Sequence, residues 1–351
     1  MVSTTHTSIG KVMDMRDITV VVQGPVHSYQ QRAMDDNITK QCLASVRQFL
    51  PKAHIILSTW PEQDLSGLDY DELIINPDPG SNIRYYTDKH KPKGLNNNRQ
   101  IVSTLNGLKA VKTKYAIKLR SDNYLTSAEF VNLFNRYQTR CDGPSVFKQR
   151  IVIPNTFSRK YAKGLPVAFH LSDFFYFGLT EDLLKLWDIP LLKNYDLEAQ
   201  GIPSPGYPNY PIDCTQMFWQ EGLKNFTFNT QLGHLHDLSH DKLHLSEQFI
   251  ANNLIIAAPE EIGLGLCDKF LGQARVNRVR GKSSFYQLSD WLNLYRQYCD
   301  AQQPMKVSAR LLLWLQRLVY VYPVMLETRF KLKKRHRRFN KRLNQTDDSS
   351  I

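Results

Sequence analysis

Strand-like and helix-like patterns alternate through the first part of the sequence, and this alternation limits the fold more than any other feature. The segment DITVVVQGPV opens with a run of β-branched residues and ends at Gly24-Pro25, as a buried parallel strand does where it enters a loop. Helix-like segments carry apolar residues at helical spacing. The alternation predicts an α/β fold with a doubly wound sheet and helices on both faces. The strand-like segments are 17–26, 53–60, 71–80 and 115–125, and the helix-like ones are 34–51 and 97–113.

Polar or turn-forming residues follow each of these strand-like segments. In a doubly wound sheet the C-terminal ends of the parallel strands lie at one edge, and ligands bind there. The sequence therefore predicts a binding site at this edge. The residues expected there are Gln23, Gly24, Pro25, Ser58, Thr59, Trp60, Asp78, Pro79, Gly80, Arg120, Ser121 and Asp122.

The segment YAIKLRSDNYL places three charges on one face of an expected strand, namely Lys118, Arg120 and Asp122. Unpaired charges inside a sheet cost several kcal/mol each, so something must compensate them. In one interpretation the two cations neutralise a bound diphosphate, and Asp122 holds a divalent cation or a ribose hydroxyl. In the other, the charges form an internal ion-pair network in which Asp122 and Asp78 satisfy Arg120 and Lys118.

The chain is basic, with 45 Lys and Arg against 33 Asp and Glu among 351 residues, a formal net charge of +12. This balance favours anionic partners, whether nucleic acid, phosphorylated ligands or an anionic membrane. The five cysteines lie far apart without a CxxC pair, which argues against a disulfide framework or zinc knuckle and for a reducing compartment. The sequence has no signal-peptide pattern and no apolar run long enough to span a membrane, so we expect a cytoplasmic protein.

The C-terminal region from about residue 301 differs in character from the rest of the chain. The apolar segment ARLLLWLQRLVYVYPVML is interrupted by Gln316, Arg317 and Pro323, and it runs into the basic segment ETRFKLKKRHRRFNKRLN. An apolar or amphipathic helix followed by cations suits binding to an anionic membrane surface, because apolar insertion and electrostatic attraction add. A solvated charged tail and a nucleic-acid-binding patch are the alternatives.

Six segments occur in order along the chain: ITVVVQGPV, CLASVRQFLPKAHIILSTW, the DPG turn, NNNRQIVSTLNGLK, YAIKLRSDNYL and LSDFFYFGLTEDLLKLW. In this combination they resemble the WavE lipopolysaccharide-synthesis family, which is similar to glycosyltransferases of the GT-A type. The resemblance covers about positions 17 to 260.

The resemblance implies a GT-A-like nucleotide-sugar-binding domain over residues 17–300, with a nucleotide half over 17–140 and an acceptor half over 141–300. A polar tail (1–16) precedes this domain, and an amphipathic, basic helical extension (301–351) follows it. The implied activity is transfer of a sugar from a nucleotide-sugar donor to a lipid-linked acceptor, the lipopolysaccharide core or a related surface polysaccharide. The extension would then hold the protein peripherally on the inner face of the inner membrane.

The resemblance also implies roles for individual residues on the donor side. In GT-A enzymes a DxD motif usually binds metal, and here Arg120-Ser121-Asp122 falls at that position, so Arg120 replaces the first carboxylate. Whether Mn²⁺ or Mg²⁺ on Asp122 or the guanidinium offsets the charge of the leaving diphosphate stays open. The expected donor-binding residues are Gln23, Gly24, Pro25, Asp78, Asn98, Arg99, Lys118, Arg120 and Asp122, with Gln100 beside them.

A glycosyl transfer with inversion needs a base that takes the proton from the acceptor hydroxyl. Asp173 in HLSDFFYFG and Asp213 in YPIDCTQMFW are candidates, because apolar and aromatic neighbours raise the pKa of a carboxyl group. The alternative for Asp213 is an N-cap, because it precedes a helix-like run. His236 and His240 would share a helix face and could bind a metal if their segment were helical.

A different class of function remains as an alternative: a non-catalytic protein that binds nucleic acid or another anionic surface through its basic tail. No zinc-finger, RNP or helix-turn-helix pattern accompanies the charge, and this alternative leaves Lys118 and Arg120 unexplained. A pyrophosphorylase-like enzyme would show a glycine-rich loop after the first strand, whereas QGPVHSY contains a single glycine.

Overall fold

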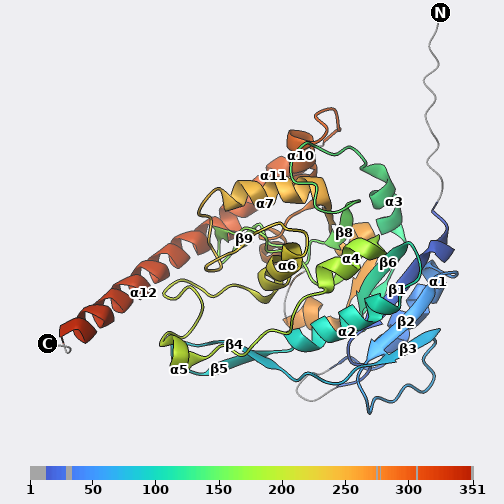
Figure 1. Ribbon diagram of the computed structural model, residues 1–351. Coiled ribbons are helices and arrows are strands. Elements are labelled where there is room, and N and C mark those ends of the chain that lie inside the picture. Colours follow the sequence, from blue (N-terminus) through green and yellow to red (C-terminus); the bar gives the residue numbers. More distant parts are fainter. Residues whose placement is uncertain (1–12, 29–33, 274–275, 277, 306, 349–351) are drawn as a thin grey trace, which may run out of the picture.

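The computed structural model describes residues 13–28, 34–273, 276, 278–305 and 307–348 (Figure 1). Its centre is a seven-stranded sheet in the order β12-β8-β11-β6-β1-β2-β3. The pairs β1–β2, β2–β3, β1–β6 and β8–β12 are parallel, while β11 runs antiparallel to β6 and β8. The strands are β1 (Ile18–Gln23), β2 (His54–Thr59), β3 (Glu72–Ile75), β6 (Tyr115–Arg120), β8 (Ile151–Pro154), β11 (Phe175–Leu179) and β12 (Leu254–Ala257).

Helices cover both faces of this sheet, as the alternating pattern predicts. Tyr176 and Lys118 are paired neighbours on one face, where the Lys118 ammonium lies 4.7 Å from the ring of Trp187 in α4 (Thr180–Trp187). Phe175 points to the other face, where its ring lies 5.3 Å from that of Phe130 in α3 (Glu129–Arg136). The further long helices of this α/β body are α1 (Ile38–Phe49), α2 (Asn97–Ala110), α6 (Cys214–Lys224), α7 (Lys242–Asn253) and α10 (Leu288–Tyr298).

The sheet contains strands from both proposed halves of the chain, so one continuous hydrophobic core joins them. The division into a nucleotide half and an acceptor half stays a prediction. Smaller elements are η1 (Met15–Asp17), β4 (Asn82–Tyr86), β5 (Pro92–Leu95), β7 (Asn123–Leu125), β9 (Tyr161–Ala162), β10 (Leu165–Pro166), α5 (Leu197–Gln200), α8 (Pro259–Ile262), β13 (Leu264–Leu266), η2 (Lys269–Gln273) and α9 (Val279–Lys282).

From the sequence we expect a polar loop, rich in Asn and Lys, between residue 80 and α2, and the structure corrects this expectation. β4 and β5 form an antiparallel hairpin there, with Asn82 opposite Leu95 and Tyr86 opposite Pro92. Pro92 and Gly94 disfavour a strand locally, so the period-two signal is too weak to be recognised without the partner strand.

Strand register brings the predicted strand ends together. Gln23 at the end of β1 lies opposite Arg120 of β6 on one side and Ser58 of β2 on the other. The next residue, Gly24, has φ +123°, and a Cβ there would lie 2.8 Å from Ser121 Oγ. Glycine is therefore required for the chain to turn this close to the end of β6.

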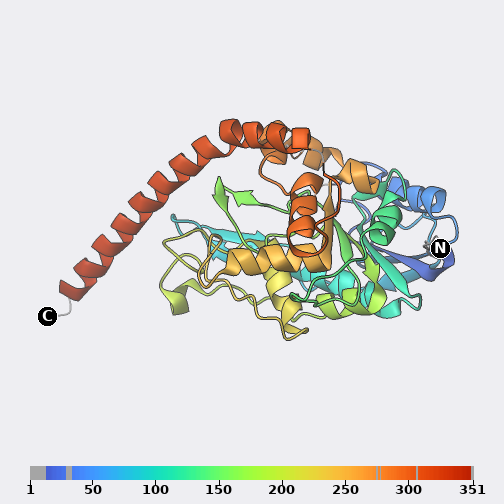
Figure 2. The same cartoon turned by 90° about the horizontal axis from the view of Figure 1, so that it is seen from above.

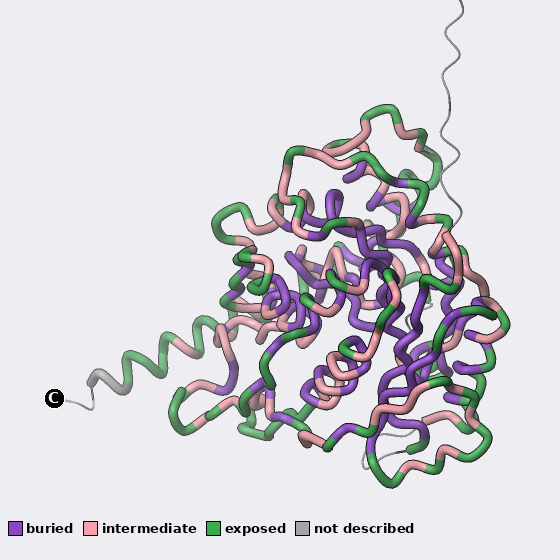
Figure 3. Tube along the Cα trace, turned by 45° about the vertical axis from the view of Figure 1, so that its right-hand side comes forward, coloured by how far each residue is buried: buried purple, intermediate pink, exposed green. Residues whose placement is uncertain are grey.

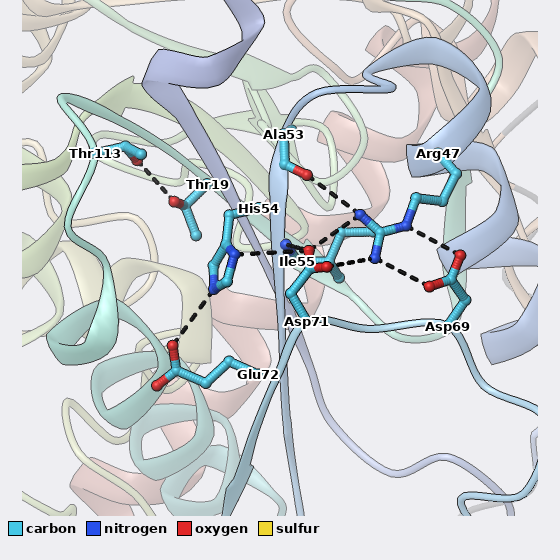
Figure 4. A network of polar contacts seen from close by, with 9 residues as sticks. All are labelled: Thr19, Arg47, Ala53, His54, Ile55, Asp69, Asp71, Glu72 and Thr113. Carbon is cyan, nitrogen blue, oxygen red and sulfur yellow. Dashed lines mark hydrogen bonds and ion pairs between the residues drawn. The ribbon is translucent and has the colours of Figure 1, made fainter.

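The opposite ends of the strands carry a separate polar network (Figure 4). Arg47 Nε and Nη2 donate to Asp69 at 3.0 Å, and its Nη1 and Nη2 donate to Asp71 at 3.0 and 2.9 Å. Asp71 also accepts from the backbone N–H of Ile55 at 2.8 Å. This network ties α1 to the start of β2 and lies away from the strand ends that carry the predicted site.

The C-terminal extension is helical, as predicted. It consists of α11 (Val307–Tyr320) and α12 (Tyr322–Asp348), with Pro323 in the first turn of α12, where its missing N–H costs little. α12 projects from the body with the C-terminus at its tip (Figures 1 and 2). The strands are mainly buried, whereas most of α12 is exposed or half-buried (Figure 3). Within the described ranges, no helix is both long and apolar enough to cross a membrane.

Candidate functional site

Five of the predicted donor-binding residues line one small cavity at the C-terminal ends of β1, β2 and β6. They are Gln23, Gly24, Pro25, Arg99 and Arg120, and the cavity volume is about 30 Å³. Trp60 was among the strand-end residues that the sequence indicated, and it also lines the cavity. The remaining wall comes from the start of α2, with Asn96, Gln100 and Ser103.

A chain of hydrogen bonds fixes the side chain of Gln23. Ser103 Oγ donates to Gln23 Oε1 at 2.7 Å, Ser58 Oγ donates to the carbonyl of Ser103 at 2.7 Å, and Asn76 Nδ2 donates to Ser58 Oγ at 2.9 Å. Since Oε1 is engaged, the amide nitrogen of Gln23 is the part of that side chain left to bind a ligand. Sequence reasoning missed Ser103 because a serine inside a helix gives no signal of its own.

Asp78 and Asn96 hold Arg99 at the rim of the cavity. Its Nε and Nη2 donate to the two oxygens of Asp78 at 2.8 Å each, and its Nη1 donates to Asn96 Oδ1 at 2.6 Å. Asp78 also accepts from the backbone N–H of Gly80 at 2.8 Å. Asp78 therefore positions Arg99 from behind, and it does not pair with Lys118 as the internal-network interpretation proposed.

Arg120 forms a second bidentate pair, with Asp122. Its Nε and Nη2 donate to the two carboxylate oxygens at 2.9 and 2.8 Å, and the Asp122 side chain is 3% exposed. The guanidinium lies 4.5 Å from the ring of Phe174 and 5.3 Å from that of Phe270. Burial acts to lower the pKa of Arg120, but the charge and hydrogen bonds of Asp122 outweigh it and raise the pKa. The guanidinium thus stays charged at the cavity wall, and this part of the ion-pair interpretation is confirmed.

Two other predicted donor residues lie outside the cavity. The Lys118 side chain is completely buried, because α4 covers that face of the sheet, and its Nζ donates to the carbonyl of Asp173. Burial lowers the pKa of Lys118 to about 7. Asn98 exchanges hydrogen bonds with the backbone of Leu192, donating at 3.0 Å and accepting at 2.8 Å. In this structure Lys118 and Asn98 therefore organise the surrounding chain rather than face a ligand.

The two candidate bases lie in different surroundings. Asp173 is buried directly behind the cavity, where Gln100 Nε2 donates to its Oδ2 at 2.6 Å. Asp213 is the N-cap of α6, with its Oδ1 accepting from the N–H of Thr215 at 3.1 Å and Gln216 completing a capping box. The N-cap interpretation of Asp213 is thus confirmed, while a catalytic role for either carboxylate stays a prediction.

His170 is a functional candidate that sequence reasoning missed. Its Nε2 lies 3.8 Å from Asp213 Oδ1, and its Nδ1 lies 3.0 Å from Thr215 Oγ1. Burial lowers the pKa of His170 to about 4, so the ring is neutral at physiological pH. Burial acts to raise the pKa of Asp213, but His170, the Thr215 amide and Arg159 together lower it. A lone histidine in the apolar run VAFHL was the available signal.

The predicted metal site on Asp122 is not an assembled set of carboxylates. Both oxygens of Asp122 accept from Arg120, and the part of the chain that the structure describes contains no group of three or more His, Cys, Asp or Glu able to hold a metal ion. His236 and His240 lie before α7 in turns and bends, not on a helix, and His236 Nε2 lies 2.9 Å from the carbonyl of Ala162. The i, i+4 arrangement that would let them share a metal is therefore absent there.

Comparison with known proteins gives one extensive match. A family model described as WavE lipopolysaccharide synthesis matches residues 18–320. No curated protein matches the chain. A cytidylyltransferase structure from Leptospira borgpetersenii is 16% identical with a TM-score of 0.29, and the match covers 50% of this chain and 66% of that one, just under two thirds. A 4-diphosphocytidyl-2C-methyl-D-erythritolsynthase structure from Anaerococcus prevotii is 11% identical with a TM-score of 0.32, covering 74% and 97%. Scores this low carry no conclusion about activity.

Proposed function

Because the chain belongs to the WavE lipopolysaccharide synthesis family, we propose that it is a glycosyltransferase of the GT-A type. It transfers a sugar from a nucleotide-sugar donor to the lipopolysaccharide core or a related surface polysaccharide. The observation that carries this proposal is the convergence of Gln23, Gly24, Pro25, Arg99 and Arg120 on one cavity at the strand ends. That edge is where α/β sheets bind nucleotides.

The two arginines supply the charge that the donor diphosphate needs. Arg99 and Arg120 are each fixed by a bidentate carboxylate, so their guanidinium groups are oriented before the donor arrives. Oriented cations stabilise the charge that develops on the leaving nucleoside diphosphate without reorganising during the reaction. Arg120 stands where a GT-A metal site usually has a carboxylate, and its guanidinium takes over the neutralising role there. Both carboxylate oxygens of Asp122 accept from Arg120, so we assign the neutralising charge to the guanidinium.

The cavity of about 30 Å³ is far smaller than a nucleotide. Ligand pockets for such molecules have volumes on the order of 300 Å³ or more. Donor binding therefore requires part of the wall to move, and the Asn96 side chain before α2 is the part we expect to yield. Its side chain is held by one hydrogen bond from Arg99, which a phosphate oxygen would replace.

Asp173 is the stronger candidate for the catalytic base. Gln100 lies between its carboxylate and the cavity, so a small shift of Gln100 would open Asp173 to the acceptor hydroxyl. Asp213 is the second candidate and lies beside the neutral ring of His170. In both cases the carboxylate would accept the hydroxyl proton as the acceptor oxygen attacks the sugar carbon.

The C-terminal helices suit a lipid-linked acceptor on an anionic membrane surface. α11 buries Leu313, but a run of large apolar side chains on α11 and the start of α12 is exposed, and α12 is rich in Lys and Arg. Apolar insertion beside cations favours peripheral binding to anionic lipid. We therefore propose a cytoplasmic protein bound to the inner face of the inner membrane. The exposed apolar residues are Val307, Leu311, Leu312, Trp314, Leu315, Leu318, Val319, Tyr320, Tyr322, Leu326 and Phe330.

Calorimetry with UDP, GDP and CMP, with and without Mn²⁺, tests the donor site. We expect one nucleotide to bind wild type and to lose about tenfold or more in affinity in Arg120→Met. Arg136→Met controls for loss of an arginine over an aromatic ring, because Arg136 lies 5.5 Å from Tyr137 and does not line the cavity. Arg120→Met/Asp122→Leu controls for the buried carboxylate that Arg120→Met leaves unpaired. Failure of all three nucleotides to bind would refute the transferase proposal.

Sedimentation with vesicles tests the membrane proposal. Vesicles containing phosphatidylglycerol should bind wild type and bind Leu311→Ser/Leu315→Ser/Val319→Ser weakly. Binding to DNA that equals or exceeds binding to these vesicles, with no effect of the three substitutions, would favour the alternative of a nucleic-acid-binding tail.

A further inference from the structure

A second cavity, of about 590 Å³, lies between the turn that joins β9 to β10, the α9 segment and the junction of α11 with α12. Four cations line it: Arg159, Lys163, Arg278 and Arg280. None of the described residues in its lining is an aspartate or a glutamate. This cationic pocket is unusual because like charges gathered around one cavity repel one another unless an anion joins them.

Arg159 is half-buried, whereas the other three cations of the pocket are exposed. Its guanidinium lies between two rings, 5.4 Å from Phe157 and 5.2 Å from Phe285. Among the described residues, no side chain forms an ion pair or hydrogen bond with this guanidinium. The two rings fix its position, and the hydrogen-bond donors remain available to a ligand.

Further positive charge approaches from the C-terminal helix. The Lys163 ammonium lies 4.5 Å from the ring of Tyr210, and the Arg335 guanidinium of α12 lies 5.0 Å from the same ring while forming an ion pair with Asp88 at 3.1 Å. Burial, and then the charges of Lys331, Arg159 and Arg335, lower the pKa of Lys163. Such convergence suits a phosphate, which accepts several charge-assisted hydrogen bonds at once.

An aromatic cluster separates this pocket from the donor cavity. Arg120 lies over Phe174 on the donor side, Arg159 lies over Phe157 on the other, and the rings of Phe157 and Phe174 are 5.3 Å apart. Arg159 also affects the pKa of Asp213, the second candidate base. The backbone N–H of Arg159 donates to the carbonyl of His170 at 2.8 Å, and the His170 ring lies 3.8 Å from Asp213, so a ligand anchored at Arg159 lies close to this second candidate base.

We infer that the cationic pocket binds a phosphate group carried by the saccharide acceptor, so that the enzyme selects a phosphorylated sugar chain. The identification of the bound molecule as an acceptor rests on the proposed transferase function. The binding of an anion at this site does not depend on that function. A free phosphate or a lipid headgroup offers the same chemistry. Ser284 lines the pocket beside the cations, and its hydroxyl can hydrogen-bond to a sugar that carries the phosphate.

Calorimetry on the full chain with glucose 6-phosphate, and with glucose as the uncharged control, tests the inference. We expect glucose 6-phosphate to bind wild type and glucose not to bind. Arg159→Met and Lys163→Met should each lower the affinity for glucose 6-phosphate by about tenfold or more. Methionine keeps an apolar stem between Phe157 and Phe285, and Arg136→Met again serves as the matched control with unchanged affinity.

Other results of these binding measurements would contradict the inference that the pocket binds a saccharide phosphate. The inference is overturned if glucose 6-phosphate does not bind wild type, or if its affinity is unchanged in Arg159→Met and Lys163→Met. If inorganic phosphate binds as tightly as glucose 6-phosphate, or if Arg159→Met abolishes vesicle binding while the sugar phosphate does not bind, the anion is not a saccharide phosphate. Binding that depends on Arg159 when no nucleotide binds would remove the transferase proposal and leave an anion site without an acceptor role.

Discussion

The proposed donor cavity and the cationic pocket each contain an arginine that lies over aromatic rings, yet the cations of the two sites differ in whether a carboxylate pairs with them. Arg99 and Arg120 each bond both oxygens of a carboxylate. Within the described residues, Arg159 and Lys163 form no ion pair and rest on rings. A paired guanidinium is oriented by the protein itself, whereas an unpaired one leaves its charge for a ligand to neutralise.

This difference in pairing determines whether the cations of each site need a bound anion to compensate their charge. A paired arginine has most of its charge compensated, so it can stay buried without a ligand and then form further bonds with its remaining donors. Unpaired cations around an open pocket raise the local positive potential and attract anions from solution. Substitutions at four positions test this difference in pairing: Arg120, Lys118, Asp213 and Arg159.

Removing Arg120 should have the largest effect, because it takes the bidentate partner away from a buried carboxylate. We expect Arg120→Met to lower the free energy of unfolding by about 3 to 5 kcal/mol. The double variant Arg120→Met/Asp122→Leu should recover most of this loss, since it removes both charges of the pair and leaves no unpaired carboxylate. Urea denaturation of wild type, both single variants and the double variant measures the coupling. A loss below about 1 kcal/mol in Arg120→Met would break the proposed contrast.

Lys118 is a third case, because it is a buried cation that bonds a backbone carbonyl and not a carboxylate. Burial lowers its pKa to about 7 in the folded state, against about 10.4 in the unfolded chain. Between these values the unfolded chain binds more protons, so the free energy of unfolding should rise with pH. The rise from Lys118 should be on the order of 3 kcal/mol between about pH 7 and about pH 10.

The control for Lys118 is Lys118→Met, measured by urea denaturation at the same pH values. Other titrating groups contribute equally to both proteins, so the difference between wild type and variant isolates Lys118. A difference that stays constant across this pH range would contradict a lowered pKa for Lys118.

Two variants of Asp213 distinguish a structural role of its carboxylate, as the N-cap of α6, from a catalytic role. Asp213→Ala should lower the free energy of unfolding by about 1 kcal/mol through loss of the N-cap, whereas Asp213→Asn should cost only a few tenths. Activity of these variants is measured as release of the nucleotide identified by calorimetry. If Asp213→Asn is stable but inactive, the charge of Asp213 is needed for the reaction; if it is active, Asp173→Asn becomes the decisive variant.

Arg159→Met should have the smallest effect on stability, within about 0.5 kcal/mol, because no described carboxylate loses a partner. Phosphate added to wild type should raise its stability by binding the folded state, and this gain should be absent in the variant. Thermal denaturation with and without phosphate provides the measurement. A loss above about 2 kcal/mol without phosphate would mean that Arg159 is a structural cation like Arg120.

The comparison also marks where sequence reasoning succeeded. Turn residues after an apolar run placed Gln23, Gly24 and Pro25 at a strand end, and the structure brings them to one cavity with Arg120, while their role in donor binding stays a prediction. Reasoning from the sequence misplaced Lys118, because strand alternation gives the face of a side chain but not what covers that face. It missed His170, whose partners lie on α6, and it missed the cationic pocket entirely.

The sequence by itself determined the α/β class, the strand ends that form the donor cavity, and the helical, basic C-terminal extension. These features follow from side-chain periodicity and turn chemistry, which act between residues close in the chain. The tertiary structure alone decided which charges are paired. Asp78 reaches Arg99 across 21 positions, while Arg159, Lys163 and Arg280 meet around one pocket from segments that no local pattern connects. Such pairings depend on strand register and helix packing, and the hydrophobic core of the whole domain sets both.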